Sequence, residues 1–569
     1  MKINSIIDLV KDLDTSRQTK NLNKLLIRIL LHLQVEFSFK RMSMKTKNFL
    51  LTGLVGLSAL TACTNEEGLT NPSNQLNEGE TYAQIVLNLT GSKATSRATD
   101  NTGDTDAGTT SEQAVQDLTV VLADNNNYVQ AIYATTLKTG GTNAANRATE
   151  PFKIPAGQYK VYVLANYNES TKGAFNETLA VGAQMDQVLT IADASKLHVA
   201  NNFLMANDDL VAQTTDFTKP ASDTEVDDDL ADESNNPETV HLVKVNIERI
   251  VAKVELDQTT KTIDVKDVNK NKIASATLEG GTLINLNKYM YMVREAKTAT
   301  NEPSGTSTWI YPQDPNYNKK LTGAEDEAAW LTANFSNPSA TSFTDFTSTP
   351  IFYCPENTMQ ADAQQNGQTT GVVYKATYTP VETAYTELAK DATSTYDQIF
   401  TAILGLGEGK DADINANIFK TAETDGKTFY TYNNLIFKNK KAAILYKSIA
   451  EAAGESISDK ASAANTAFTS NKTKSGAGLD AIKVYEYTAG VSYYTAWVKH
   501  NPDGSNMQQD KFGVVRNHWY VLTVNSISGL GYHKPAFKDP EDPDDKAEAN
   551  IQVAATIKDW TVVKQSVDL

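Results

Sequence analysis

The chain has 569 residues, which is enough for two or three domains with complete hydrophobic cores, and its formal net charge is −17. This acidic balance argues against nucleic acid and anionic lipid as partners, because both are bound by clusters of Lys and Arg. The 24 Tyr residues, together with many Thr, Asn and Gly, favour a mainly β fold.

An export signal is predicted near the N-terminus, after residue 43. Residues 44–62 combine a basic start with the apolar run Asn48–Leu60, which is too short to span a membrane and is typical of a signal peptide. Residues 1–43 precede this complete signal. We therefore expect them to reflect an upstream start codon assigned in error, with Met42 or Met44 as the true start.

The signal ends in Leu-Thr-Ala-Cys, which resembles the lipobox of bacterial lipoproteins and implies a lipid on Cys63. The alternative is ordinary signal cleavage beside a chance cysteine. The other cysteine, Cys354, lies in a predicted strand and is expected to be a small buried hydrophobe. An internal disulfide is not expected, because Cys63 sits at the processing site.

Residues 63–97 are interpreted as a lipidated propeptide that carries a removable first strand. Apolar side chains alternate with other residues along this strand, at Ala83, Ile85, Leu87 and Leu89. A period of two predicts a strand with one face in a core. The loop behind the strand is small and polar and contains Arg97, followed by Ala98. Cleavage after Arg97 would release the strand and leave a groove that another strand must fill.

Residues 98–257 are predicted to form an N-terminal β-sandwich. Its expected strands are Asp117–Asp124, Asn127–Leu137, Gln158–Ala165, Phe203–Asp208 and the long run Val240–Asp257.

Residues 258–548 are predicted to form a second β-sandwich. Its expected strands include Ile351–Thr358, Thr370–Val381, residues 481–488, residues 490–500 and Phe512–Leu530. Between about 382 and 470 the apolar period becomes helical, with Ile399, Ile403 and Leu404 on one face. We therefore expect a partly helical insertion in this sandwich.

Residues 549–569 follow a Pro/Asp-rich linker and are predicted to form a donor strand for the neighbouring subunit. Its apolar residues occur in two registers, and Trp560 lies where the register changes. The predicted donor residues are Ile551, Val553, Ile557, Trp560, Val563, Val567 and Leu569. The pattern does not decide which register enters the neighbour. If the tail pairs with its own sandwich, Trp560 belongs to the intramolecular core.

The sequence gives no support for catalysis, a metal site or a cofactor. The His residues lack zinc-ligand spacing, and the glycine-rich stretch 405–410 lacks the flanking residues of a phosphate loop. Residues 411–415 begin like a calcium loop, but Ala416 replaces the required glycine and Ala422 the bidentate glutamate. We expect a protein that is not an enzyme.

Several stretches resemble the structural fimbrillins of the Bacteroidales type V pilus, most closely the major subunit of the short fimbriae. They are Gln158–Ala165, Val245–Leu256, Tyr493–Asp503, Val514–Gly531 and the closing residues from Ile557. The resemblance implies a two-domain β-sandwich lipoprotein at the outer membrane, cut after an arginine by an arginine-specific protease. It further implies a homopolymer in cell-surface fimbriae, with tip and anchor subunits as partners and roles in adhesion and biofilm formation. Arg97-Ala98 lies where the family's cut falls.

Two other interpretations stay open. One is a monomeric lipoprotein that binds glycans or another ligand at the surface through exposed aromatic residues. The other is a tip or anchor subunit of the same pilus. A C-terminal donor strand favours a shaft subunit, because a tip that only accepts a strand needs no donor.

Overall fold

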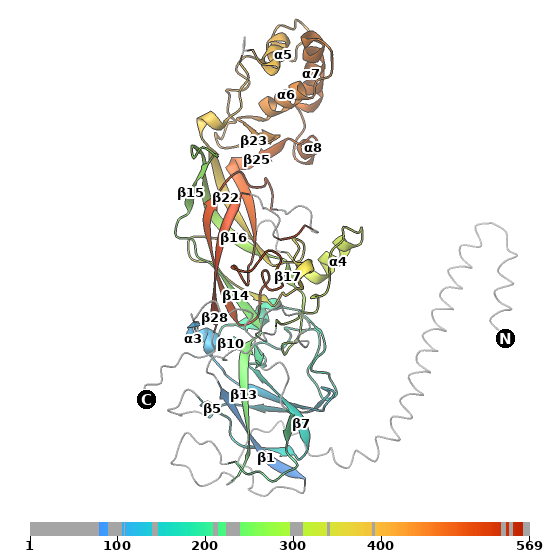
Figure 1. The fold of residues 1–569 in the computed structure, drawn as a ribbon, viewed down its shortest axis with the longest axis vertical. Helices are drawn as coiled ribbons and strands as arrows, with labels where there is room; N and C mark the ends of the chain where they lie inside the picture. Colours follow the sequence, from blue (N-terminus) through green and yellow to red (C-terminus); the bar gives the residue numbers. More distant parts are fainter. Residues whose placement is uncertain are drawn as a thin grey trace, which may run out of the picture. The chain divides into compact units, whose positions relative to one another are not determined.

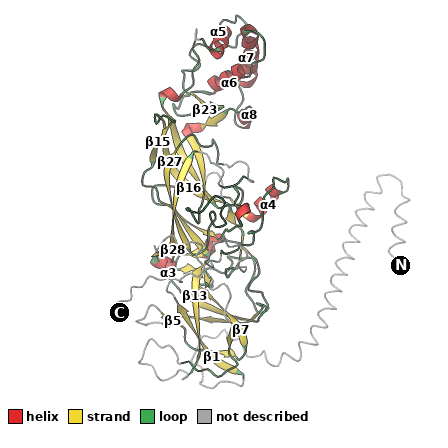
Figure 2. Ribbon diagram, viewed as in Figure 1, coloured by secondary structure: helices red, strands yellow, loops and turns green. Residues whose placement is uncertain are grey.

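The computed structural model describes most of the chain after residue 78. The described ranges are 79–88, 105–106, 108–138, 146–208, 214–223, 239–295, 311–337, 342–389, 393–535, 542–544 and 550–560. All of them belong to one compact unit, residues 76–569. The fold is mainly β, as predicted, with several sheets and a small group of helices (Figure 1, Figure 2).

The first sheet has the strand order β4-β3-β7-β11-β13-β1-β5, with β12 beside β7 and β6 beside β1. Its strands are β1 Glu80–Asn88, β3 Leu118–Ala123, β4 Val129–Thr135, β5 Asn146–Ala148, β6 Phe152–Pro155, β7 Gln158–Ala165, β11 Met205–Asn207, β12 Thr214–Asp216 and β13 His241–Arg249. Apolar side chains of β1, β3, β7 and β13 enter one hydrophobic core, which we call the first core.

The second part of the fold is a sandwich of two sheets, ordered β2-β28-β27-β14-β21 and β15-β16-β22-β26, with β20 beside β16. Their strands are β2 Thr105–Asp106, β14 Val251–Leu256, β15 Thr262–Lys266, β16 Lys272–Ile284, β20 Thr344–Asp345, β21 Ile351–Pro355, β22 Gly371–Pro380, β26 Val491–Trp497, β27 His518–Ile527 and β28 Ile551–Trp560. Side chains from both sheets form the second core.

The boundary between the two parts differs from the predicted one. The run Val240–Asp257 is not one strand, because β13 ends at Arg249 and β14 begins at Val251 in another sheet. The intervening Ile250 is fully buried, and its backbone N–H donates to the carbonyl oxygen of Leu204 at 3.2 Å. The expected boundary after Asp257 therefore lies at Ile250.

A partly helical insertion extends the second sandwich (Figure 2). Its elements are α5 Thr395–Leu404, α6 Lys440–Ala450, α7 Ile457–Asn471, α8 Ala477–Asp480, β23 Phe429–Tyr432, β24 Leu435–Phe437 and β25 Tyr485–Tyr487. Ile399 and Ile403 are buried in a core formed by this insertion alone, and Leu404 packs against it. The helices of the insertion therefore have their own hydrophobic support.

Short elements complete the described chain: α3 Thr110–Gln113, β8 Leu189–Thr190, η1 Ala194–Leu197, β9 His198–Val199, β10 Asn202–Phe203, β17 Leu286–Asn287, β18 Tyr289–Met290, α4 Glu327–Asn334, β19 Phe335–Ser336, η2 Ala361–Ala363, η3 Glu382–Ala384 and η4 Thr488–Gly490. Among the described helices, none is both long and apolar enough to cross a bilayer.

Candidate functional site: the first strand and the base of the C-terminal tail

Strand β1 lies inside the first sheet rather than at its edge (Figure 1). On one side it pairs in parallel with β13, from Ala83 opposite His241 to Asn88 opposite Asn246. On the other side it pairs antiparallel with β6 and then with β5. Both backbone edges of β1 are therefore in use along most of its length.

Both faces of β1 are buried as well. Ala83, Ile85 and Leu87 are at most 2% exposed and belong to the first core. On the opposite face, Tyr82, Gln84 and Val86 are also buried: these three lie between 0% and 5% exposed. Without β1, an apolar groove with unpaired N–H and C=O groups along β13, β5 and β6 would remain, and such a groove pairs readily with another strand.

Polar contacts to Thr149 fix β1 further. The side-chain amide of Gln84 donates to the carbonyl oxygen of Thr149 at 2.9 Å. The backbone N–H of Ile85 donates to Thr149 Oγ1 at 3.2 Å, and the N–H of Thr149 donates to the carbonyl oxygen of Ile85 at 2.9 Å. Thr149 is fully buried, so these bonds are shielded from water.

The start of the predicted donor segment belongs to the chain's own sandwich. β28 pairs antiparallel with β27, from Ile551 opposite Ile527 to Asp559 opposite His518. Ile551 and Val553 pack against the second core. The backbone of Ile557 faces Tyr520 in this ladder. These residues therefore have an intramolecular partner, and the donor interpretation is narrowed to the residues after Trp560.

Trp560 anchors the end of β28 in the first core. It is fully buried in the same cluster as Ala83, Ile85 and Leu87. Its ring stacks on Tyr353 with a centroid distance of 5.8 Å and meets Phe203 edge-on, also at 5.8 Å. The open alternative for Trp560 is thus decided: its side chain is part of the intramolecular core.

Buried charges surround Trp560. Arg249 donates from Nη1 to the carbonyl oxygen of Trp560 at 2.8 Å, and its guanidinium carbon lies 4.2 Å from the indole centroid. Lys253 lies 3.5 Å from the ring centroid of Trp519 and pairs with Glu112 at 2.9 Å. A buried cation is tolerated only when it is paired, and Glu112 and the indole rings supply the partners.

Glu112 belongs to the segment that follows the predicted cut. Its carboxylate accepts from the N–H of Thr109 at 2.6 Å in a capping box and from the Tyr353 hydroxyl at 2.5 Å. Burial alone would raise the pKa of Glu112, but the hydrogen bonds from Tyr353 and Lys253 lower it below its usual value. Burial and the bond to Glu112 raise the pKa of Tyr353.

The same segment covers Trp560 closely. β2 pairs in parallel with the end of β28, with Asp106 opposite Trp560. Gly108 has a φ of +73°, and a Cβ at this position would lie 2.5 Å from the indole nitrogen of Trp560. Only glycine fits this backbone without displacing the ring.

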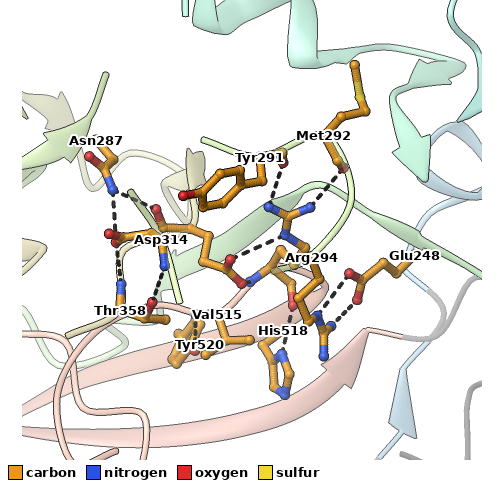
Figure 3. Close-up of polar contacts among 12 residues, drawn as sticks. Glu248, Asn287, Tyr291, Met292, Arg294, Asp314, Thr358, Val515, His518 and Tyr520 are labelled. Atoms are coloured by element: carbon orange, nitrogen blue, oxygen red, sulfur yellow. Dashed lines mark hydrogen bonds and ion pairs between the residues drawn. The ribbon is translucent and has the colours of Figure 1, made fainter. Parts of the chain in front are cut away.

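A second buried polar network links β13 with the loop before β27 (Figure 3). Arg294 donates from Nε to Glu248 Oε1 at 3.1 Å, and a second nitrogen of the same guanidinium pairs with Oε2. Arg516 donates to the carbonyl oxygen of Tyr291 at 2.9 Å and pairs with Glu356 at 3.5 Å. All four charged side chains are buried, so each needs its partner.

Asp314 extends this network (Figure 3). Its Oδ2 accepts from the N–H of Thr358 at 2.7 Å and from the side-chain amide of Asn287 at 2.9 Å. Burial raises the pKa of Asp314 to about 8, and the hydrogen bonds act in the opposite direction. The Asp314 carboxylate is hydrogen-bonded within the fold, and the network links β13 of the first sheet with the loop before β27 of the second part.

The remaining predicted site residues are placed as follows. Cys63, Leu89, Arg97, Ala98, Val563, Val567 and Leu569 lie outside the described residues. Cys354 is a free, fully buried cysteine, and burial raises the pKa of its thiol to about 12.

Sequence analysis did not identify Glu112, Arg249 or Lys253 as members of a site. A usable signal was present, because Arg249 and Lys253 interrupt the apolar run of β13 and β14. Charged residues in a buried strand require partners nearby. The partner Glu112 comes from far away in the sequence, and no periodicity indicates this contact.

The described residues contain no group of His, Cys, Asp and Glu able to hold a metal ion. In the stretch that begins like a calcium loop, Asp411 and Asp413 instead pair with Lys472 at 2.7 Å and 2.9 Å. Asp413 also pairs with Lys441 at 2.6 Å.

Residues 485–566 match the family model described as "Major fimbrial subunit protein type IV, Fimbrillin, C-terminal". The match begins at β25 and includes β26, β27 and β28, and therefore the anchored Trp560. The C-terminal region of this chain is therefore similar to that of fimbrial subunits. The resemblance to fimbrillins predicted from the sequence is thereby confirmed.

Three solved structures are similar to this chain at low sequence identity. A Parabacteroides distasonis protein proposed to act in cell adhesion is 13% identical, with 84% of this chain and 99% of that chain covered and a TM-score of 0.38. A fimbrilin of Porphyromonas gingivalis is 14% identical, with 85% and 99% covered and a TM-score of 0.36. The tip fimbrial protein Mfa3 of the same organism, with a C-terminal truncation, is 11% identical, with 84% and 100% covered and a TM-score of 0.27. Among curated proteins, no sequence matches the chain.

Proposed function

We propose that this protein is a shaft subunit of a cell-surface fimbria that polymerises by donor-strand exchange. The observation that carries the proposal is the position of β1. It is buried on both faces and paired on both edges, yet the only stretch that joins it to the rest of the fold contains Arg97. A central strand on a cleavable connection is suited to removal and replacement.

The replacement strand in this proposal is the tail beyond Trp560. Residues 561–569 number as many as the nine residues of β1, and a fully extended strand of this length spans about 30 Å. Val563, Val567 and Leu569 supply apolar side chains for the pockets of Ile85 and Leu87. Each such side chain, once buried, contributes about 1.5–3 kcal/mol.

The proposed life cycle follows from these parts. The chain is exported as an outer-membrane lipoprotein with the lipid on Cys63, and an arginine-specific protease cuts between Arg97 and Ala98. β1 departs with the lipid, and the tail of an identical subunit enters the groove by β-strand addition. The resulting homopolymer, with tip and anchor subunits at its ends, supports adhesion and biofilm formation.

The test is the variant Arg97→Ala, expressed in cells that make the fimbriae. We expect the precursor to keep β1 and its lipid and to remain monomeric, with no filaments in electron micrographs. Arg147→Ala is the matched control for loss of an arginine near the groove and should still assemble. Normal filaments from Arg97→Ala would refute the mechanism.

A further inference from the structure

The tripeptide Arg-Ala-Thr that begins at Arg97 occurs a second time in the chain, at Arg147. Arg97 is followed by Ala-Thr-Asp, and Arg147 is followed by Ala-Thr-Glu. Five arginines follow Cys63, and the three others have buried side chains: Arg249, Arg294 and Arg516. For a protease that requires arginine, Arg147 is therefore the one other position with the same following residues.

Arg147 lies in the wall of the groove. It belongs to β5, the strand next to β1, and the two strands pair with Leu87 opposite Arg147 and Val86 opposite Ala148. Ala148 is 1% exposed. Thr149, two residues after Arg147, is held by Gln84 and Ile85 of β1 through the three hydrogen bonds described above.

Among the described residues, the contacts on the other side of this segment come from Leu137 and Lys138, and Lys138 also forms an ion pair with Glu150 at 3.6 Å. β5 is the last strand of its sheet path, so its other edge has no full partner among the described strands. On that side the N–H of Lys138 donates to the carbonyl oxygen of Ala148 at 2.9 Å, and Leu137 forms an isolated bridge with Thr149. Loss of β1 would remove the ladder with residues 86–88 and the Thr149 contacts together.

We propose that the Arg147–Ala148 peptide bond is a second, conditional cleavage site for an arginine-specific protease. The site is closed while a strand occupies the position of β1 and opens when the groove is empty. Cleavage requires the segment to leave the sheet and enter the protease as a free extended strand, and this local opening is opposed by the contacts with β1. Water adds across the amide bond, which leaves a carboxylate on Arg147 and an amine on Ala148.

The consequence is selective removal of subunits that lose β1 without receiving a donor. A cut in β5 destroys one wall of the groove, so such a subunit can no longer accept a strand. Subunits within a polymer are protected, because the donor restores the pairing of β5. This inference rests on the proposed function for its biological setting, but the opening of the site can be tested separately.

The experiment treats the purified full-length chain with an arginine-specific endoprotease and identifies new N-termini by mass spectrometry over time. We expect Ala98 to appear first and Ala148 later. A synthetic peptide of residues 80–88 in excess should slow the appearance of Ala148 at least tenfold and leave that of Ala98 unchanged. Equal rates of Ala148 formation with and without the peptide would overturn the inference.

Three variants distinguish a failure of this inference from a failure of the proposed function. Arg147→Lys should lose the Ala148 terminus alone, and Arg97→Lys, which keeps β1 attached, should lose both termini. Ile85→Asp weakens the seating of β1 and should accelerate cleavage at Arg147 even when Arg97 is not cut. Formation of Ala148 at the wild-type rate in Arg97→Lys contradicts the inference.

Cleavage at the buried arginines is the internal control for global unfolding. In Ile85→Asp, cuts at Arg147 without cuts at Arg249, Arg294 or Arg516 indicate local opening of the groove. If Ile85→Asp resists cleavage at Arg147, the inference is wrong and the proposed function stands. If wild-type protein is not cut at Arg97 but Ile85→Asp is cut at Arg147, the proposed function is wrong and the inference stands.

Discussion

Arg249 donates a hydrogen bond to the carbonyl oxygen of Trp560, although 311 residues separate them in the sequence. Arg249 is the last residue of β13, and the first six residues of β13 form one wall of the groove around β1. A single strand therefore lines the groove at one end and holds the base of the tail at the other. The accepting and donating ends of the proposed subunit are linked through it.

The first prediction concerns this anchor. Trp560→Ala should lower the free energy of unfolding by about 3–5 kcal/mol, because a fully buried indole is replaced by a cavity. Urea unfolding of the purified protein measures the change. Thr556→Ala alters an exposed residue of the same strand and should cost far less. A loss below 1 kcal/mol for Trp560→Ala would show that the anchor is dispensable.

The second prediction is that a change in β1 affects the stability of the precursor but not that of the polymer. Ile85→Asp places an unpaired charge in the first core and should strongly destabilise the precursor. If β1 is absent from the mature subunit, filaments that do form should melt at the wild-type temperature. Val268→Asp, at a residue that is 97% exposed, is the matched control and should change neither form. Filaments of Ile85→Asp with a lowered melting temperature would mean that β1 remains in the polymer.

The third prediction concerns the two cysteines. Cells grown with a labelled fatty acid should label the wild-type precursor and the variant Cys354→Ala, but not Cys63→Ala. Cys354 should also resist thiol reagents until the protein unfolds, because its thiol is fully buried and its pKa is raised to about 12. Label on Cys63→Ala equal to that on the wild type would mean that the lipid is carried by another residue.

The fourth prediction concerns pH. Burial lowers the pKa of His500 well below 6.5, and the nearby His518 and Arg294 lower it further. Below pH 6.5 the unfolded chain therefore binds a proton that the folded chain does not. The free energy of unfolding then falls by about 1.4 kcal/mol per pH unit from this residue as the pH is lowered.

His500→Asn should remove this part of the acid sensitivity. The Tyr520 hydroxyl accepts a hydrogen bond from the N–H of Val515 and lies 2.7 Å from Nδ1 of His500. In His500→Asn, the side-chain oxygen of the asparagine can take the place of Nδ1 beside this hydroxyl. Urea unfolding of both proteins at pH 7 and pH 5 measures the difference. The same slope in both proteins would mean that His500 does not titrate on unfolding.

Local sequence patterns predicted some elements well. The strand expected at Gln158–Ala165 has these bounds in the structure, and Ile399 and Ile403 are buried as their helical spacing indicated. The run Val240–Asp257 was interpreted as one strand, since a continuous apolar run carries no sign that the chain changes sheets at Ile250. That change depends on packing with distant segments.

Other parts of the fold were missed for similar reasons. Within the predicted helical insertion, α7 was not identified as an individual helix, because its buried face consists mainly of small residues such as Ala461 and Ala464. Its capping box, formed by Ser456 and Asp459, was a signal that could have located its start. The position of β28 within its own sandwich was also undecidable from periodicity, because an apolar edge strand looks the same whichever chain supplies its partner.

The parallel ladder between β1 and β13 has a mechanical consequence for a filament built in the proposed way. A tail seated in place of β1 and pulled along the filament is loaded along its own axis, so the hydrogen bonds of the ladder resist in shear and share the force. From β13 the chain passes through Ile250 directly into β14. β14 pairs with β27, and β27 pairs with β28, so tension would reach the subunit's own tail through these two further ladders.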